Sequence, residues 1–166
     1  MHVFLKSCYT RIQLAIQYKA NEAFIKEPSQ ILGLDLGDQW IGIACSDKSG
    51  SFAFPLTTVT RADLVTALTH ILHEKPDVKK VVVGLPITMQ GNKSQQTLQV
   101  EVMTEALKQQ FPHLEWIFWD ERLSSKRAMG KSTLKDKTEK LRQHAKAAAH
   151  ILDLYLTFQT VHRSTH

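Results

Sequence analysis

A single aspartate, Asp35, stands in an otherwise apolar stretch of the sequence, with Gly33 two positions before it and Gly37 two positions after it. Burying a carboxylate among apolar residues costs free energy unless it binds a cation or hydrogen-bond donors. The flanking glycines would let a phosphate group or a backbone segment come close to it. Asp35 is therefore a candidate metal ligand. The alternative is an aspartate that caps the turn of a hairpin.

Two more carboxylates, Asp120 and Glu121, directly follow an apolar run at residues 116–119. Successive side chains of a strand point to opposite faces of the sheet, so at most one of the two shares a face with Asp35. We expect one of them to be catalytic and the other to be structural. The simpler alternative is that they are polar only because strand ends often are.

The elements that must position these residues are predicted by the spacing of apolar side chains. Residues 31–44 contain three glycines and predict a hairpin, and residues 52–59 predict a third strand. Apolar residues recur at helical spacing in residues 62–73, again around 100–107, and from 141 to 155. Short apolar runs at 81–83 and 116–119 predict two further strands, the first of them buried on both faces.

This order of elements predicts an α/β fold with a five-stranded mixed sheet, in which three antiparallel strands precede alternating helices and strands. Ligands bind such sheets at the carboxyl ends of strands, where both Asp35 and Glu121 are placed. We expect residues 30–158 to form this domain. Residues 1–29 form a separate N-terminal extension with a weak helical pattern, and residues 159–166 form a polar tail.

The positive charge of the chain is concentrated in one segment. The formal net charge is +5, but residues 122–146 alone contain nine basic and two acidic residues and carry +7, so the remainder is slightly acidic. A localised positive field favours a polyanionic partner, and nucleic acid in particular. The alternative is a solvated basic loop and helix face without a partner.

The cysteine content and the hydropathy pattern exclude several classes of protein. Two cysteines, Cys8 and Cys45, are too few for a four-cysteine zinc site, and a disulfide framework is not expected in a chain with this much core. No apolar run approaches the ~18 residues of a membrane span. We therefore expect a soluble, cytoplasmic protein with no membrane partner. The oligomeric state is left open.

Several motifs follow one another in a recognisable order. They are Gly33-Leu-Asp-Leu-Gly37 with Ile41-Gly-Ile-Ala44 and Ser46-Asp47, then Val81-Val-Val-Gly-Leu-Pro86, then Asp120-Glu-Arg-Leu-Ser124, and finally Ala147-Ala-Ala149 with Ile151-Leu152 and Tyr155-Leu156. Each motif alone is weak, but together and in this order they resemble the YqgF/RuvX family. The resemblance covers residues 31–156, and it implies an RNase H-like fold related to RuvC resolvases.

The resemblance implies a nuclease that matures the 5′ end of pre-16S ribosomal RNA, an activity that would bring it into association with the ribosome. Holliday-junction resolution on branched DNA is the alternative activity. The implied cofactor is a pair of Mg²⁺ or Mn²⁺ ions, which require convergent carboxylates. Asp35 would bridge the ions and Glu121 would be the second ligand, with Asp120 as a further candidate metal ligand. Basic residues would hold the phosphate backbone, namely Arg122, Lys126, Arg127 and Lys131.

The sequence departs from the family pattern at two positions. Members usually carry an aspartate at the start of the last helix, where this chain has His144. A neutral imidazole can bind a metal ion and favours Mn²⁺ over Mg²⁺, but it adds no negative charge. Asp153 cannot easily replace it, because nine residues at ~100° each place it on the opposite helix face. The second departure is Gln90, where the family usually has aspartate.

Two other functions remain open at this point. If His144 does not support catalysis, the protein would be a nucleic-acid-binding or ribosome-assembly factor without nuclease activity. Actin-like and sugar-kinase-like ATPases also begin with a Gly-x-Asp-x-Gly hairpin, but they enclose their nucleotide between two such domains, and this chain has room for one. Neither the metal ligands nor phosphate contacts distinguish RNA from DNA.

Overall fold

The computed structural model describes residues 29–88, 90–120 and 137–163. The predicted N-terminal extension lies outside these residues, apart from its last position. Glu121 and the four predicted phosphate-binding residues, Arg122, Lys126, Arg127 and Lys131, also lie outside them.

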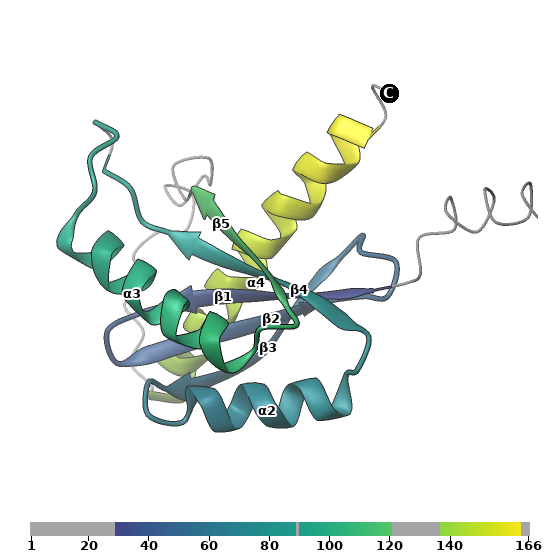
Figure 1. Ribbon diagram of the computed structural model, residues 1–166, viewed down its shortest axis with the longest axis horizontal. Helices are drawn as coiled ribbons and strands as arrows, with labels where there is room; N and C mark the ends of the chain where they lie inside the picture. Colours follow the sequence, from purple (N-terminus) through teal and green to yellow (C-terminus); the bar gives the residue numbers. More distant parts are fainter. Residues whose placement is uncertain (1–28, 89, 121–136, 164–166) are drawn as a thin grey trace, which may run out of the picture.

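The centre of the molecule is a five-stranded sheet (Figure 1). Its strands are β1 (Gln30–Leu36), β2 (Trp40–Ser46), β3 (Ala53–Thr60), β4 (Val78–Leu85) and β5 (Glu115–Asp120), in the spatial order β3-β2-β1-β4-β5. β1 pairs antiparallel with β2, and β2 with β3, whereas β4 runs parallel to both β1 and β5. The predicted mixed sheet of an RNase H-like fold is therefore confirmed.

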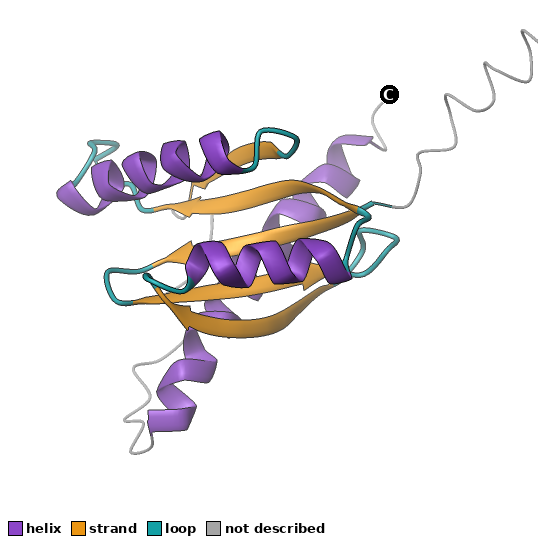
Figure 2. Cartoon of the chain, turned by 60° about the horizontal axis from the view of Figure 1, so that its bottom comes forward, coloured by secondary structure: helices purple, strands orange, loops and turns teal. Residues whose placement is uncertain are grey.

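Helices cover both faces of this sheet (Figure 2). α2 (Leu64–Glu74) and α3 (Gln95–Gln110) pack on one face, and the long helix α4 (Lys137–Arg163) packs on the other. Each face has its own apolar core, and Leu34 and Leu68 lie in the first and Val82 and Leu152 in the second, all at most 1% exposed. None of the helices described has the combination of length and apolar character that a bilayer crossing requires.

The boundaries of two helices differ from those predicted. α3 begins earlier than its apolar residues indicate, because Ser94 and Thr97 form a capping box in which each side chain accepts a hydrogen bond from the backbone of the other. α4 begins at Lys137, four residues before the helical spacing of apolar residues that starts at residue 141. A polar first turn lacks the apolar spacing that marks a helix in the sequence.

The alternation of side chains along β1 decides which residues can meet α4. Leu32, Leu34 and Leu36 belong to the core shared with α2 and α3. Ile31 belongs to the core shared with α4. Because strand side chains alternate between faces, Asp35 is directed to the α4 side of the sheet together with Ile31.

Candidate functional site

Asp35 lies near the carboxyl end of the central strand and is half-buried. Its direct partner on the antiparallel strand β2 is Gly42, and directly paired residues project on the same face. Gly42 has no side chain, so no Cβ stands next to the Asp35 carboxylate on the face of the sheet that α4 covers. The absence of this Cβ lets the backbone of α4 approach the sheet beside the carboxylate.

The backbone of α4 rests directly on Gly42. A Cβ added to Gly42 would lie 1.9 Å from the carbonyl oxygen of His144 and 3.0 Å from the amide nitrogen of Ala145. A similar contact occurs at Gly33, where an added Cβ would lie 2.9 Å from the carbonyl oxygen of Ala148. Of the two flanking glycines predicted to admit a phosphate or a backbone, Gly33 admits the backbone of the last helix, whereas Gly37 lies against the carbonyl of Trp40.

His144 lies on the side of α4 that leads toward β5. Its position follows the same helical stripe as Ala148, Ile151 and Tyr155, at steps of four, seven and eleven residues. The ring of Tyr155 meets Trp119 of β5 edge-to-face, with 5.6 Å between ring centroids. His144 is half-buried, so the structure brings this histidine and Asp35 to one face of the sheet.

Asp153 does not share this environment. It is exposed on α4, as the prediction of an opposite helix face requires. Of His144 and Asp153, it is therefore His144 that α4 directs toward the sheet.

The structure distinguishes Asp120 from the residue that precedes it. Trp119 is 8% exposed and packs in the α4 core, so the next residue of β5, Asp120, is directed to the opposite face. Asp120 pairs with Leu85, which contacts the core shared with α2 and α3. This geometry argues against Asp120 as a metal ligand on the Asp35 side. Glu121 lies outside the described residues.

The Ser46-Asp47 motif has a structural role at the turn between β2 and β3. The buried Ser46 hydroxyl accepts a hydrogen bond from the Ile31 amide at 2.9 Å, which ties the start of β1 to the end of β2. The Asp47 carboxylate accepts hydrogen bonds from the Ser51 and Phe52 amides at 2.7 and 2.9 Å. Hydrogen bonds from the Ser49 side chain and from these amides lower the pKa of Asp47 to about 2.

Gln90 lies in a tight turn after β4. The Gly91 amide donates to the Thr88 carbonyl at 2.8 Å, and Gly91 has a φ of 83°, which favours glycine there. Gln90 itself is exposed. Nothing in the described residues explains why aspartate is replaced by glutamine at this position.

The donor set on the α4 face fits a divalent metal ion only in part. Asp35 supplies a carboxylate and His144 an imidazole, both ligand types that Mn²⁺ accepts. Among the residues that the structure describes, no three metal-ligating side chains form a group. A complete site therefore requires a further ligand from residues outside that set, and Glu121 is the predicted one.

The strand order of this sheet, with the last helix packed across one face, defines an α/β protein with an RNase H-like fold. Within it, a half-buried carboxylate lies near the end of the central strand. The profile of the RuvX family, described as "Holliday junction resolvase", matches residues 29–158. The chain belongs to this family.

Curated relatives agree with this assignment. A protein of Sulfurihydrogenibium sp. is 36% identical over 132 residues, which cover 77% of this chain and 90% of that protein. One of Acetivibrio thermocellus is 38% identical over 133 residues, covering 76% of this chain and 94% of its own length. Both are named "Putative pre-16S rRNA nuclease". Among solved structures, Thermus thermophilus RuvC in complex with a Holliday junction substrate matches with a TM-score of 0.49 and 11% identity, over 78% of this chain and 96% of that one.

Sequence reasoning missed the contact between Gly42 and α4. The only signal was the coincidence of a glycine in β2 with an alanine-rich stripe in the last helix. Which glycine meets which turn of the helix depends on strand register, and the sequence alone does not set that register.

Proposed function

We propose that this protein is a divalent-metal-dependent nuclease that processes the 5′ end of pre-16S ribosomal RNA. The observation that carries the proposal is the placement of Asp35 and His144 on the same face of the sheet, with the α4 backbone resting on Gly42. The names of the curated relatives support rRNA as the substrate. In this proposal residues 30–158 are the catalytic domain, and the protein acts in the cytoplasm in association with ribosomal precursors.

Asp35, Glu121 and His144 would hold the metal ions in this proposal. A pair of bound Mg²⁺ or Mn²⁺ ions supplies a water of lowered pKa and offsets the charge that develops on the phosphate. Asp35 is oriented for this role by its strand and by its pairing with Gly42. Since His144 is neutral when it binds a metal, the site carries less negative charge than one built from carboxylates alone, and we expect it to favour Mn²⁺.

The proposal assigns the second carboxylate to Glu121 instead of Asp120. Asp120 is directed to the face that α2 and α3 cover, beside Leu85. Regular alternation would direct the following residue to the face of Asp35. Glu121 is thus the ligand that the proposal requires, and Asp120 a structural residue.

The basic residues that follow this carboxylate would hold the substrate. Arg122, Lys126, Arg127 and Lys131 would contact the phosphate backbone on either side of the cleaved bond. Such contacts are independent of base sequence and weaken as the salt concentration rises. They position the nucleic acid but do not select RNA over DNA.

The proposal is tested by incubating the native protein with Mn²⁺ or Mg²⁺ and two labelled substrates: a pre-16S rRNA fragment and a four-way DNA junction. We expect cleavage of the rRNA fragment, abolished by EDTA and reduced by at least ~100-fold in Asp35→Asn and Glu121→Gln, because a metal-ligating carboxylate loses its charge. Cleavage of the junction alone would replace the rRNA assignment with resolvase activity.

The matched control is Asp38→Asn, which removes an exposed carboxylate from the turn three residues after Asp35. This variant should cleave as the native protein does. No cleavage of either substrate by the native protein, or equal cleavage by Asp35→Asn and Asp38→Asn, would overturn the proposal.

One observation favours a second candidate, a nucleic-acid-binding factor without catalysis. The position usually held by aspartate in the family is His144, which adds no negative charge to a metal site. Such a factor would bind RNA with a strong salt dependence and would retain that binding in Asp35→Asn.

A further inference from the structure

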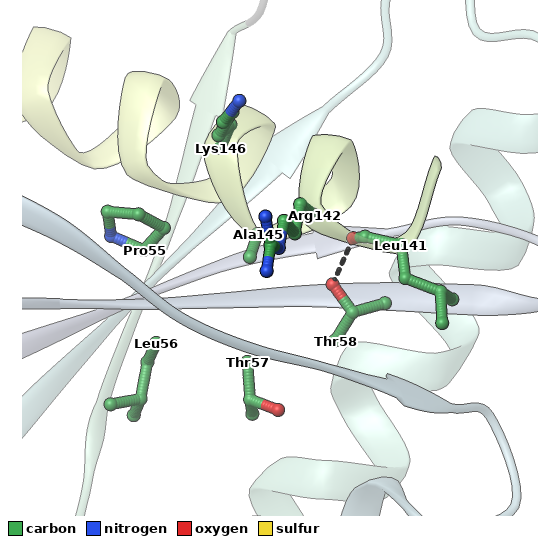
Figure 3. A pocket seen from close by; sticks show the side chains of 8 residues that line it. All are labelled: Pro55, Leu56, Thr57, Thr58, Leu141, Arg142, Ala145 and Lys146. Carbon is green, nitrogen blue, oxygen red and sulfur yellow. Dashed lines mark hydrogen bonds between the residues drawn. The ribbon is translucent and has the colours of Figure 1, made fainter. Parts of the chain in front are cut away.

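A pocket of about 360 Å³ lies between the edge strand β3 and the first turns of α4 (Figure 3). The residues that line it are Pro55, Leu56, Thr57, Thr58, Leu141, Arg142, Ala145 and Lys146. The Thr58 hydroxyl donates a hydrogen bond to the Leu141 carbonyl at 2.6 Å and joins the two walls at one end. The volume is within the range of small-molecule sites, about 300–1,000 Å³.

Both apolar and basic side chains line this pocket. Pro55 and Thr58 face α4, since their partners on β2 are Ala44 and Gly42, and Leu141 and Ala145 face them from the helix. In Figure 3 the side chains of Leu56 and Thr57 point away from the helix, so these two residues border the pocket through their backbone. Leu56 is the extra residue of a β-bulge and has no register partner on β2.

Arg142 and Lys146 provide the positive charge. They stand one helical turn apart on the side of α4 opposite His144, and no acidic residue is among those that line the pocket. Lys146 makes an ion pair of 3.8 Å with Glu139, and both side chains are more than 40% exposed. An exposed pair of this kind contributes little, so a phosphate could displace the Glu139 carboxylate.

The pocket lies close to the proposed catalytic centre. Asp35 pairs with Gly42, and Gly42 pairs with Thr58, so the three residues form a row across β1, β2 and β3. Two strand spacings separate Asp35 from the pocket, or ~10 Å in a straight line. The α4 backbone rests on Gly42 between them, so a substrate strand can join the two only by passing around the helix.

We propose that this pocket holds one unpaired nucleotide of the substrate, on the side of α4 that faces away from the proposed catalytic centre. Arg142 and Lys146 hold its phosphate, and the wall formed by Pro55, Leu141 and Ala145 contacts its sugar and base. A base within a duplex is stacked and paired and cannot enter such a recess. The inference rests on the proposed nuclease function and deepens it, because it makes a single-stranded segment of the substrate a feature that the protein recognises.

The test measures binding of a fluorescent single-stranded RNA in EDTA, where no cleavage occurs. The double variant Arg142→Ala/Lys146→Ala should bind ~10- to 100-fold more weakly, the range for losing one or two charge-assisted hydrogen bonds. The slope of log affinity against log salt concentration should fall by about 0.7, since the one phosphate contact that is lost on a single strand contributes ~0.7. Native protein should bind the single strand more tightly than a duplex of the same length.

The matched control is Lys79→Ala/Lys108→Ala, which removes the same charge from β4 and from α3 on the other face of the sheet. Its affinity and salt slope should stay close to those of the native protein. A 5-iodouridine in the RNA should crosslink under ultraviolet light to peptides that contain Pro55 or Leu141, and these crosslinks should disappear in Arg142→Ala/Lys146→Ala.

The outcomes separate this inference from the proposed function. If the native protein cleaves RNA while Arg142→Ala/Lys146→Ala binds with native affinity and slope, the function stands and the pocket assignment is overturned. Equal losses in both double variants, or equal binding of duplex with no crosslink in the pocket, overturn it as well. If the native protein binds through Arg142 and Lys146 but never cleaves, the pocket assignment stands and the nuclease proposal fails.

Discussion

Gly42→Ala tests whether the contact between β2 and α4 sets the position of His144. The added Cβ would lie 1.9 Å from the His144 carbonyl oxygen, whereas ordinary van der Waals contact begins at 3.4 Å. The first turns of α4 and strand β2 must therefore separate by about 1.5 Å. The carbonyl oxygen is a backbone atom and the Cβ is fixed to its Cα, so neither can rotate out of the way. The separation must move His144 relative to Asp35, which is paired with Gly42.

Two consequences of different size are expected from this displacement. Overpacking a close contact destabilises a protein by ~1–3 kcal/mol, which leaves a domain of ordinary stability folded. A misplacement of ~1 Å among catalytic groups lowers a rate by on the order of 100-fold. Gly42→Ala should therefore fold, shown by urea unfolding, and should cleave the pre-16S rRNA fragment ~100-fold more slowly under single-turnover conditions with Mn²⁺.

Gly50→Ala is the control. Gly50 has a φ of 67° and open space around it, so alanine there costs ~1–2 kcal/mol through backbone strain and touches nothing in α4. It should lose stability to a similar extent and keep its rate of cleavage. Native cleavage by Gly42→Ala, or an equal loss of rate in both variants, would refute the reasoning that the glycine contact positions the site.

Three further outcomes are expected. The folded-state pKa of Asp47 is about 2, below its ordinary 3.8. Its carboxylate therefore contributes stability above about pH 4, and this stability is lost as the pH falls through 2. In acid unfolding curves, the difference in free energy of unfolding between native protein and Asp47→Asn should shrink over that interval. Ser46→Ala leaves the buried Ile31 amide without its hydrogen bond and should lower the free energy of unfolding by ~1–3 kcal/mol in urea, and an unchanged midpoint would contradict the assigned bond. His144→Asp adds a negative charge beside Asp35 and should raise the rate with Mg²⁺ relative to Mn²⁺ in parallel assays, whereas an unchanged ratio would count against His144 as a ligand.

The sequence was sufficient to predict the order of elements and the strand that carries Asp35. Both follow from local patterns: a carboxylate in an apolar run between glycines, and apolar spacing that changes between the periods of strand and helix. The limit that at most one of Asp120 and Glu121 shares a face with Asp35 also followed from the alternation of strand side chains. Which face Asp120 takes depends on where Trp119 packs, and an aromatic ring can pack on either face of a central sheet.

The pocket beside β3 was beyond prediction for a different reason. It depends on a bulge that adds one residue, Leu56, to the edge strand, and on the helix beginning at Lys137 so that Arg142 and Lys146 stand opposite that bulge. Pro55 is typical of an edge strand or a bulge, but it does not show which residue is the extra one. The basic residues were predicted to matter as a charged segment, but the two that line the pocket were not distinguished from the rest.

If position 144 holds a metal ligand, as proposed, the contact between Gly42 and α4 fixes where that ligand stands without fixing its chemical type. Gly42 meets the carbonyl oxygen of residue 144, an atom that every amino acid possesses, so the placement of that position does not depend on its side chain. In the proposed site, aspartate can therefore replace histidine at 144 by a single substitution without refitting the helix, and so change which metal ion the site prefers. No such freedom exists at position 42, because no side chain at 144 can make room for a larger residue beneath it.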